Sequence, residues 1–391
     1  MGSRSVASAE EGWRPRRLFP AATVVVLATA LGCAGGDGQT HAQGADGGVS
    51  PRAAFDTNDS GVVSRGCVSS PKNFEIPGND CDDDGDGLVD VVPRCDADLP
   101  ENGTADHFAK AIGLCNRATT ESWGLVSARY SGSYGTEYVP NPSQTGILPR
   151  FGSAIRPRHG SSLGVLSSGV AREWNGNAGA SFKQGLAMTG PGQLPPGYPQ
   201  PAEGCVIDSS VFDVATVKLN IAVPANAKGV AFDFNYYSGE WPEWVCTRYN
   251  DGFLAMLTSR ATGGVPTNIS FDGLRNPVSV NNVYFDRCTA GALTGCRGQP
   301  AVPKTSLCAG GETELAGTGF SARDFFCGEQ ASSAGGATGW LTSQAAVVPG
   351  EVITLEFLIW DTGDSNFDSS VLLDNLRWQV ADTETRTERP K

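Results

Sequence analysis

The chain has 391 residues, with 29 Lys and Arg against 42 Asp and Glu, which gives a formal net charge of −13 at pH 7. This charge repels phosphate backbones and anionic surfaces, so it argues against nucleic acid as a partner. The 50 Gly, 24 Pro and only 18% charged residues are typical of a turn-rich β protein rather than a helical one. The length suffices for one large domain or two ordinary ones.

Residues 1–32 have the pattern of a lipoprotein signal peptide. A basic segment at 14–17 precedes an uncharged run at 18–31, which is too short to span a bilayer but suits a signal-peptide core. The run ends in Ala-Leu-Gly before Cys33, which resembles the bacterial lipobox apart from the order of the small residues. We therefore expect export, cleavage before Cys33 and anchoring through its acylated thiol, at the outer membrane or cell surface. Arg16-Arg17 also fits a twin-arginine signal.

The cysteine count disfavours the twin-arginine route. The sequence has 11 cysteines, so 10 remain besides Cys33, and an even number in an exported chain predicts up to five disulfides. A fold that needs disulfides cannot be completed in a reducing cytosol. None of the ten has C-x-x-C spacing, which disfavours a zinc or thioredoxin-like site. Connectivity stays open, although Cys288 with Cys296 and Cys308 with Cys327 would close short loops.

The segments after the signal peptide differ in composition. Residues 33–65 are rich in Gly, Ala and Asp, which predicts a flexible tether. Residues 66–100 form a small, Cys-bounded acidic module, and apolar residues at helical spacing predict a short helix over 104–118, N-capped by its first residue. The main domain extends over 101–381, and residues 382–391 form a polar tail.

Strands separated by Gly, Pro and Asn turns account for most of the main domain. The predicted strands are Leu163–Ala171, Gly229–Ser238, Phe253–Ser259, Val278–Phe285, Glu351–Asp361 and Ser370–Val380. Within VITLEFLIW, residues 352–360, both faces are apolar, which indicates a central strand with Ile353, Leu355, Phe357 and Ile359 toward the core. The predicted fold is mainly β, a jelly-roll-like sandwich with one short N-terminal helix and a small Cys-bounded calcium loop.

The sharpest motif is DDDGDGLVD at residues 82–90, which places Gly87 at the sixth position of a D-x-D-x-D-G-x-x-D pattern. It matches the first part of an EF-hand loop, and Pro93 replaces the bidentate Glu at position 12. We therefore expect a loop-type calcium site like those of dockerin or thrombospondin type 3 repeats, bracketed and stapled by Cys81 and Cys95. The alternative is a solvated acidic loop without an ion. The predicted ligands are Asp82, Asp84, Asp86 and Asp90.

A second acidic group lies in the hairpin WDTGDSNFDSSVLLDNLRW at residues 360–378. Its members are Asp361, Asp364, Asp368 and Asp374. Asp side chains cap turns, but four of them beside apolar strands also suggest a structural calcium at the edge of the sandwich. Both interpretations stay open.

Four stretches resemble the choice-of-anchor L domain, a family of bacterial surface proteins whose anchoring device varies. They are GVLSSGVA (164–171), FDFNYYSGEWPEWVCTRYNDGFLAML (232–257), PVSVNNVYFD (277–286) and IWDTGDSNFDSSVLLDN (359–375). The likeness covers about residues 105–380 and implies a β-sandwich surface domain with no catalytic residues to carry over. The segment CDDDGDGLVD also resembles metal-binding motifs common on myxobacterial cell-surface proteins.

The segment from Glu240 to Trp244 pairs carboxylates with aromatic rings of the kind that stack on sugars. The resemblance suggests ion or ligand contact for its acids, and the candidate ligand-binding residues are Glu240, Trp241, Glu243, Trp244 and Asp251. We expect a non-enzymatic surface domain that binds a glycan, a matrix component or a protein. The alternative is a secreted glycan-acting hydrolase that uses Glu240 and Glu243 as acid and base. Residues 160–164 also fit G-x-S-x-G, but a strand follows where the nucleophile elbow needs a helix.

Overall fold

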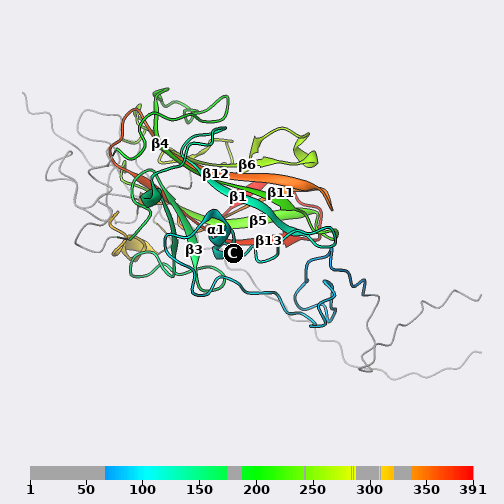
Figure 1. The fold of residues 1–391 in the computed structure, drawn as a ribbon. Coiled ribbons are helices and arrows are strands. Elements are labelled where there is room, and N and C mark those ends of the chain that lie inside the picture. The colour runs from blue at the N-terminus through cyan, green and yellow to red at the C-terminus, as the bar shows by residue number, and fades with distance from the viewer. Residues whose placement is uncertain are drawn as a thin grey trace, which may run out of the picture. The chain divides into compact units, whose positions relative to one another are not determined.

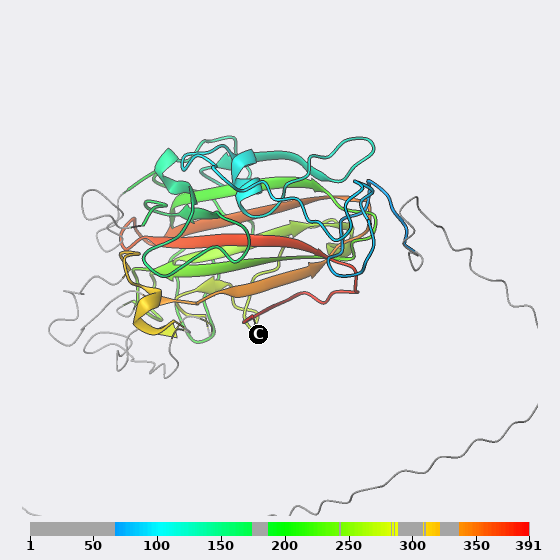
Figure 2. The ribbon, with the colours of Figure 1, turned by 90° about the horizontal axis from the view of Figure 1, so that it is seen from below.

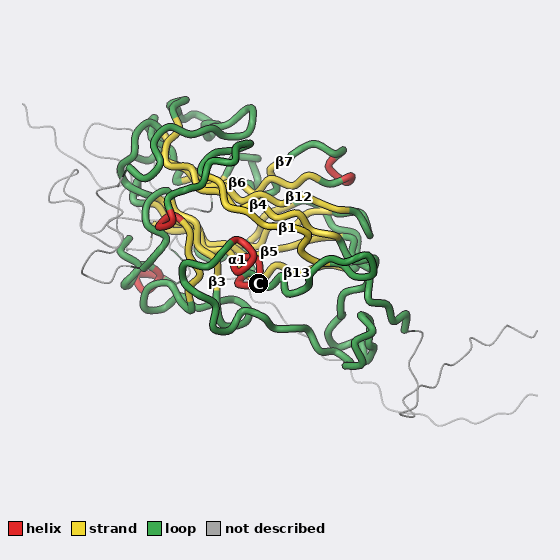
Figure 3. Tube along the Cα trace, viewed as in Figure 1, coloured by secondary structure: helices red, strands yellow, loops and turns green. Residues whose placement is uncertain are grey.

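Two antiparallel sheets face each other across a shared apolar core (Figures 1 and 2). The computed structural model describes residues 67–173, 187–241, 244–282, 284, 286–287, 308, 310–320 and 336–390. The predicted signal peptide, Cys33 and the tether lie outside these residues. Strands dominate the described chain and loops gather at the two ends of the sheets (Figure 3), so the mainly β prediction is confirmed.

The first sheet has the order β1-β4-β12-β6-β7, with β8 paired to β6. Its strands are β1 (Gly124–Ser131), β4 (Val211–Ala222), β12 (Val352–Thr362), β6 (Gly252–Thr258), β7 (Thr267–Asn268) and β8 (Val278–Ser279). The predicted strand over 278–285 is therefore only two residues long. The central strand β12 pairs with β4 on one side and β6 on the other. Both of its faces are apolar because one packs in the main core and the other, with Leu358 and Trp360, packs in a second apolar cluster.

The second sheet has the order β14-β11-β5-β13-β3-β2, and β10 joins β5 to β9. Its strands are β14 (Arg386–Glu388), β11 (Leu341–Ala346), β5 (Gly229–Ser238), β13 (Ser369–Gln379), β3 (Leu163–Ser167), β2 (Thr145–Leu148), β10 (Gly336–Ala337) and β9 (Asp286–Arg287). Within the described residues, short 3-10 helices cover Pro142–Gln144, Arg260–Thr262 and Gly311–Glu314. All strand pairs between named strands are antiparallel.

Aromatic side chains fill the space between the sheets. Phe232 of β5 lies 4.8 Å, between ring centroids, from Phe357 of β12, and Phe234 lies 5.1 Å from Phe253 of β6. The predicted inward set is confirmed, because Ile353, Leu355, Phe357 and Ile359 are all fully buried. Full burial of each such side chain contributes about 1.5–3 kcal/mol.

The helix α1 (Ala105–Ala111) begins as predicted and ends earlier than predicted. The Thr104 hydroxyl accepts a hydrogen bond from His107 N, and Thr104 N donates to the His107 ring, which completes a capping box. Gly113 has φ +101°, a left-handed backbone that ends the helix. No helix in the described part of the chain is long and apolar enough to cross a bilayer.

Disulfides join Cys67 to Cys81, Cys95 to Cys115 and Cys205 to Cys246. Cys308 is also disulfide-bonded. Cys81 and Cys95 bracket the Asp-rich loop as expected but are not joined to each other. The Cys67–Cys81 disulfide joins the start of the Asp-rich loop to the N-terminal end of the module. The Cys95–Cys115 disulfide joins the segment after the loop to the segment that follows α1. Cys288, Cys296 and Cys327 lie outside the described residues.

We expect non-reducing mass spectrometry to find the three described disulfide pairs and no free thiol among the ten cysteines after residue 66, because an oxidising compartment does not preserve unpaired thiols. Alkylation of native, unreduced protein measures the free thiols directly, and the same reaction after reduction is the control. Several alkylated cysteines in the native protein would contradict the prediction.

Candidate metal centre

Three carboxylates converge in the Asp-rich module. Oxygens of Glu75, Asp82 and Asp84, the loop cluster, lie within 4.8 Å of one another. Asp82 and Asp84 are two of the predicted ligands, and Glu75 is an addition that the motif did not indicate. Glu75 is only 4% exposed, and the other two are half-buried. A donor set made only of carboxylate oxygens suits a hard cation such as calcium.

The backbone turns tightly around Asp82. Its Oδ1 accepts hydrogen bonds from Gly85 N at 2.9 Å and Asp86 N at 3.1 Å, and its Oδ2 accepts one from Gly87 N at 3.1 Å. Gly85 and Gly87 have φ of +75° and +90°, so the left-handed backbone explains both glycines of the motif. The loop is therefore ordered by its own first carboxylate, which fixes Asp82 and Asp84 in position.

Asp86 and Asp90 lie outside the loop cluster. The exposed Asp86 accepts a hydrogen bond from Leu88 N at 2.7 Å. Asp90 accepts hydrogen bonds from Gly78 N at 2.6 Å and Asn79 N at 3.0 Å, so it holds an earlier turn of the module. The spacing of the motif thus places two of its four predicted ligands in the cluster and two in supporting turns.

Electrostatics in the loop cluster oppose three ionised carboxylates without a cation. Burial raises the pKa of Glu75 and, as a further cause, the charge of Asp84 raises it too. Burial also raises the pKa of Asp84, with added repulsion from Asp86, Asp82 and Asp83. Backbone N–H groups partly offset these effects for both acids. A bound divalent cation would remove the repulsion that remains.

The module contacts the sandwich next to Glu75. Phe74 N donates a hydrogen bond to the Asn226 side chain at 2.9 Å, and Asn226 donates back to Phe74 O at 2.9 Å. The Trp123 indole N–H donates to Asn73 O at 2.5 Å. Asn226 lies in the turn between β4 and β5, at one end of the sandwich. Glu75 directly follows Phe74, so the loop cluster lies beside this hydrogen-bonded contact. Order at Glu75 therefore supports docking of the module.

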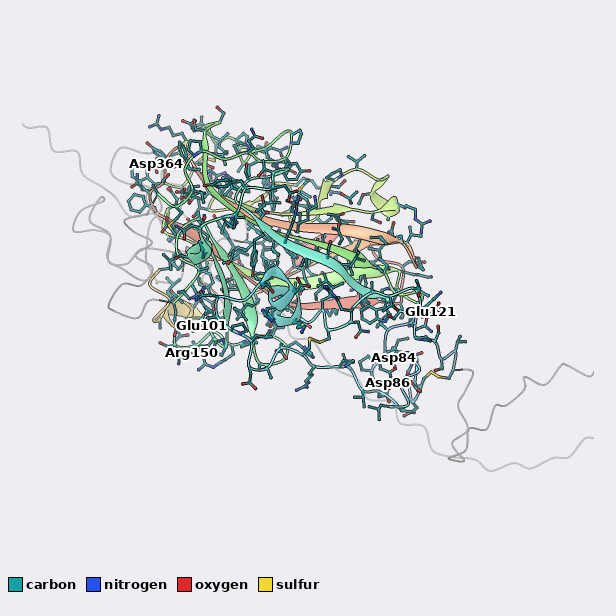
Figure 4. The ribbon with its side chains drawn as sticks, in the orientation of Figure 1. Asp84, Asp86, Glu101, Glu121, Arg150 and Asp364 are labelled. Carbon is teal, nitrogen blue, oxygen red and sulfur yellow. A yellow bond between two sulfur atoms is a disulfide. The ribbon has the colours of Figure 1, made fainter. Side chains whose placement is uncertain are left out.

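The acids of the second predicted group separate into different environments. Asp361 and Asp368 are buried at one end of the sandwich, and Asp364 is half-buried in the loop between β12 and β13. Asp374 lies inside β13 and accepts hydrogen bonds from the backbone N–H groups of Arg158 and His159. Burial raises the pKa of Asp374 to about 7. Figure 4 shows Asp364 at the opposite end of the molecule from Asp84 and Asp86.

The predicted ligand-contact residues are mostly buried. Glu240, Trp241 and Asp251 are 2%, 1% and 0% exposed, and Trp241 belongs to the main core. A ligand on the outer surface would not reach these three side chains as they are packed here, and contact of Glu240 and Asp251 with an ion stays a prediction. Trp244 is half-buried, with its ring 5.2 Å from that of Tyr249. Glu243 lies outside the described residues.

The G-x-S-x-G segment is a carboxylate-binding turn. Ser161 N and Ser162 N both donate to the Asp96 carboxylate, and the Ser162 hydroxyl donates to Asp96 O at 2.8 Å. Gly160 has φ +72°, and a Cβ there would meet Asp96 Oδ2 at 2.1 Å. The glycine and serines therefore hold the end of the acidic module against the start of β3.

Comparison with known proteins identifies the family of the sandwich domain. The family model described as the choice-of-anchor L domain matches residues 165–377, more than half of the chain. The chain belongs to the choice-of-anchor L family. It is therefore a surface-associated β-sheet protein. No curated protein matches, and no solved structure matches.

The matched choice-of-anchor L segment runs from β3 through β13, and it contains Glu240, Asp251, Asp361 and Asp368. The loop cluster precedes that segment. The two acidic groups of this choice-of-anchor L protein thus belong to different parts of the chain and can be tested separately.

Proposed function

We propose that this choice-of-anchor L protein is an exported lipoprotein, anchored at the outer membrane or cell surface through acylated Cys33. Its disulfide-bonded, calcium-stabilised sandwich binds an extracellular glycan, matrix component or protein and catalyses no reaction. The observation that carries this proposal is the loop cluster, in which Glu75, Asp82 and Asp84 converge beside the contact between module and sandwich. Family membership supports the surface location.

Calcium at the loop cluster would act as a structural clamp. The ion would hold Glu75 to the Asp82 turn, and Glu75 adjoins the Phe74 backbone that is hydrogen-bonded to Asn226. Loosely held extracellular calcium modules bind the ion with a Kd of about 10⁻⁴–10⁻³ M. The ectodomain would thus gain its full stability only after export.

We expect the melting temperature of the full-length protein to rise with calcium and fall with chelator. A cation that binds only the folded state contributes about 2.7 kcal/mol at a hundredfold excess over Kd. Replacing Asp82 and Asp84 by Asn should shrink this response, because two of the three converging carboxylates lose their charge. Asp86→Asn is the matched control and should keep most of the wild-type response, because the charge of Asp86 acts on Asp84 but its carboxylate lies outside the cluster. Magnesium should substitute poorly because it requires stricter octahedral geometry.

Melting that is indifferent to calcium and to chelator would contradict the calcium part of the proposal. An equal loss of response in the control would show that net charge, rather than the cluster, is responsible. A glycan array probed with the purified protein tests the binding part, with matrix proteins as the second panel.

The hydrolase alternative has little support from the geometry. An acid and base pair must flank the scissile bond of a bound sugar, whereas Glu240 is 2% exposed and its neighbour Trp241 is packed in the core. Turnover of a polysaccharide by the wild-type protein, lost in Glu240→Gln, would overturn the non-enzymatic proposal.

A further inference from the structure

A second group of acids meets between the two sheets, at the end of the sandwich far from the Asp-rich loop. Its members are Asp213 in β4, Glu240 just after β5, Asp251 just before β6, Asp361 near the end of β12 and Asp368 just before β13. All five, the buried acid cluster, are at most 2% exposed. They meet because β4, β6 and β13 begin at this end of the molecule and their antiparallel partners β12 and β5 finish there.

Asp361 is the central and least satisfied member. Both of its carboxylate oxygens are buried without a well-formed hydrogen bond in the described chain, and the nearby Ser168 hydroxyl only partly offsets the effect of burial on the pKa of Asp361. The Oδ2 atom of Asp213 is likewise buried without a hydrogen bond within the described chain, although its Oδ1 accepts from Thr189 N and Gly190 N, each at 2.7 Å. An ionised carboxylate buried without partners costs several kcal/mol.

Asp251 is oriented toward the cluster by a chain of hydroxyl groups. Tyr236 donates to Ser369 Oγ at 3.1 Å, and Ser369 donates to Asp251 Oδ2 at 2.8 Å. Thr362 N donates to Asp251 Oδ1 at 3.0 Å. These donors come from both sheets, since Ser369 begins β13 and Thr362 ends β12. Asp251 is therefore held at the junction of the sheets.

Three acids of this cluster form no ion pair in the described parts of the chain. None of the ion pairs there involves Asp213, Asp251 or Asp361. The positive charge of Arg248 interacts with Asp208 and Asp364, which lie outside the buried acid cluster. Burial raises the pKa of Asp361 well above its usual range, with added repulsion from Asp251 and Asp368, and burial raises the pKa of Asp251 to about 7.

A proton and a cation are the two means of relieving this repulsion. One proton shared by Asp251 and Asp361 would join a single oxygen of each and would leave the second Asp361 oxygen with only the nearby Ser168 hydroxyl. A cation accepts both oxygens of one carboxylate and several carboxylates together. No three acids of this cluster have oxygens that all lie within 4.8 Å of one another. Calcium–oxygen bonds of about 2.3–2.6 Å place ligands on opposite sides of the ion about 5 Å apart, so carboxylates that share one calcium ion need not all lie within 4.8 Å of one another.

We propose that Asp251, Asp361 and Asp368 bind a calcium ion between the two sheets, with Asp213 beside them. This centre goes beyond the proposed function, because it uses none of the loop cluster and lies inside the choice-of-anchor L domain. Asp361 brings in the first sheet and Asp368 the second, so the ion cross-links the sandwich where β12 passes into β13. Asp374 takes no part, since its carboxylate holds the backbone at residues 158–159.

Terbium luminescence and calcium calorimetry test this centre in the full-length protein with Asp82→Asn and Asp84→Asn, which disable the loop cluster. We expect this variant to keep one calcium ion per chain and to sensitise bound terbium through Trp360, the neighbour of Asp361. Trp360→Phe should reduce that emission severalfold, and Trp123→Phe, which changes the tryptophan beside the loop cluster, should leave it unchanged. Adding Asp361→Asn should weaken binding at least tenfold. Asp374→Asn is the matched control, equally buried and on the same hairpin, and should bind like its parent.

The outcomes separate this centre from the loop cluster. If the wild-type protein binds two calcium ions and the loop variant binds one, both sites are supported. If each of them binds one ion, only the buried centre is supported. If the loop variant binds neither calcium nor terbium, the buried centre is overturned and the acids share protons instead. Should Asp361→Asn fail to fold, terbium emission that calcium displaces from the loop variant, and that Trp360→Phe removes, still supports the centre. Its absence overturns it.

Discussion

Cys33→Ala is expected to move the protein from the membrane fraction to the soluble fraction, or to leave it as an unprocessed precursor. The acyl chains supply about 0.8 kcal/mol for each buried CH₂ group, and two or more chains are enough for stable anchoring. After the uncharged run at residues 18–31, the sequence has no other apolar stretch long enough to hold a membrane. Without the thiol, no acceptor for the lipid remains.

Fractionation after a high-salt wash, with labelling by a radioactive fatty acid, measures this effect. The Ser50→Ala variant in the tether is the control and should stay labelled and membrane-bound. A Cys33→Ala protein that remains firmly in the membrane fraction would disprove lipid anchoring, while family membership would stand.

Trp241→Ala is expected to lower the free energy of unfolding by about 3–5 kcal/mol, the usual cost of removing a large buried aromatic side chain. Trp241 is 1% exposed and belongs to the main core between the sheets. The half-buried Trp244 is the matched control three residues later, and Trp244→Ala should cost clearly less.

Chemical denaturation in saturating calcium measures both variants on the same footing. The same pair distinguishes core packing from sugar stacking. A Trp241→Ala protein with unchanged stability and lost glycan binding would show that this ring faces a ligand, and it would reverse the assignment drawn from its burial.

Local patterns in the sequence were sufficient for several elements. The apolar run of β12 indicated a central strand, because a strand with neighbours on both edges and a partner sheet buries most of its side chains. Thr104 indicated the start of α1 because capping depends only on residues within one turn. The strand β4 was missed, although Val217, Leu219 and Ile221 alternate with polar residues as a half-buried strand should.

Only part of the Asp-rich site could be predicted from its motif. Its glycines and first carboxylate form the turn that the spacing predicts, since that geometry is local. Glu75 and the pairing of Cys67 with Cys81 were not predicted, because both depend on how the preceding segment folds back on the loop. Spacing along the chain does not determine which segment returns.

The sequence by itself determined the leader pattern, the mainly β class, the core face of β12 and the family resemblance. Only the tertiary structure decided which acids meet. Asp251 and Asp361 are 110 positions apart in the sequence and are neighbours because β6 and β12 pair, whereas Asp374, close to Asp361 in sequence, lies farther along β13. Alternation along a strand specifies the face a side chain occupies, and the order of strands within and between sheets specifies its partners.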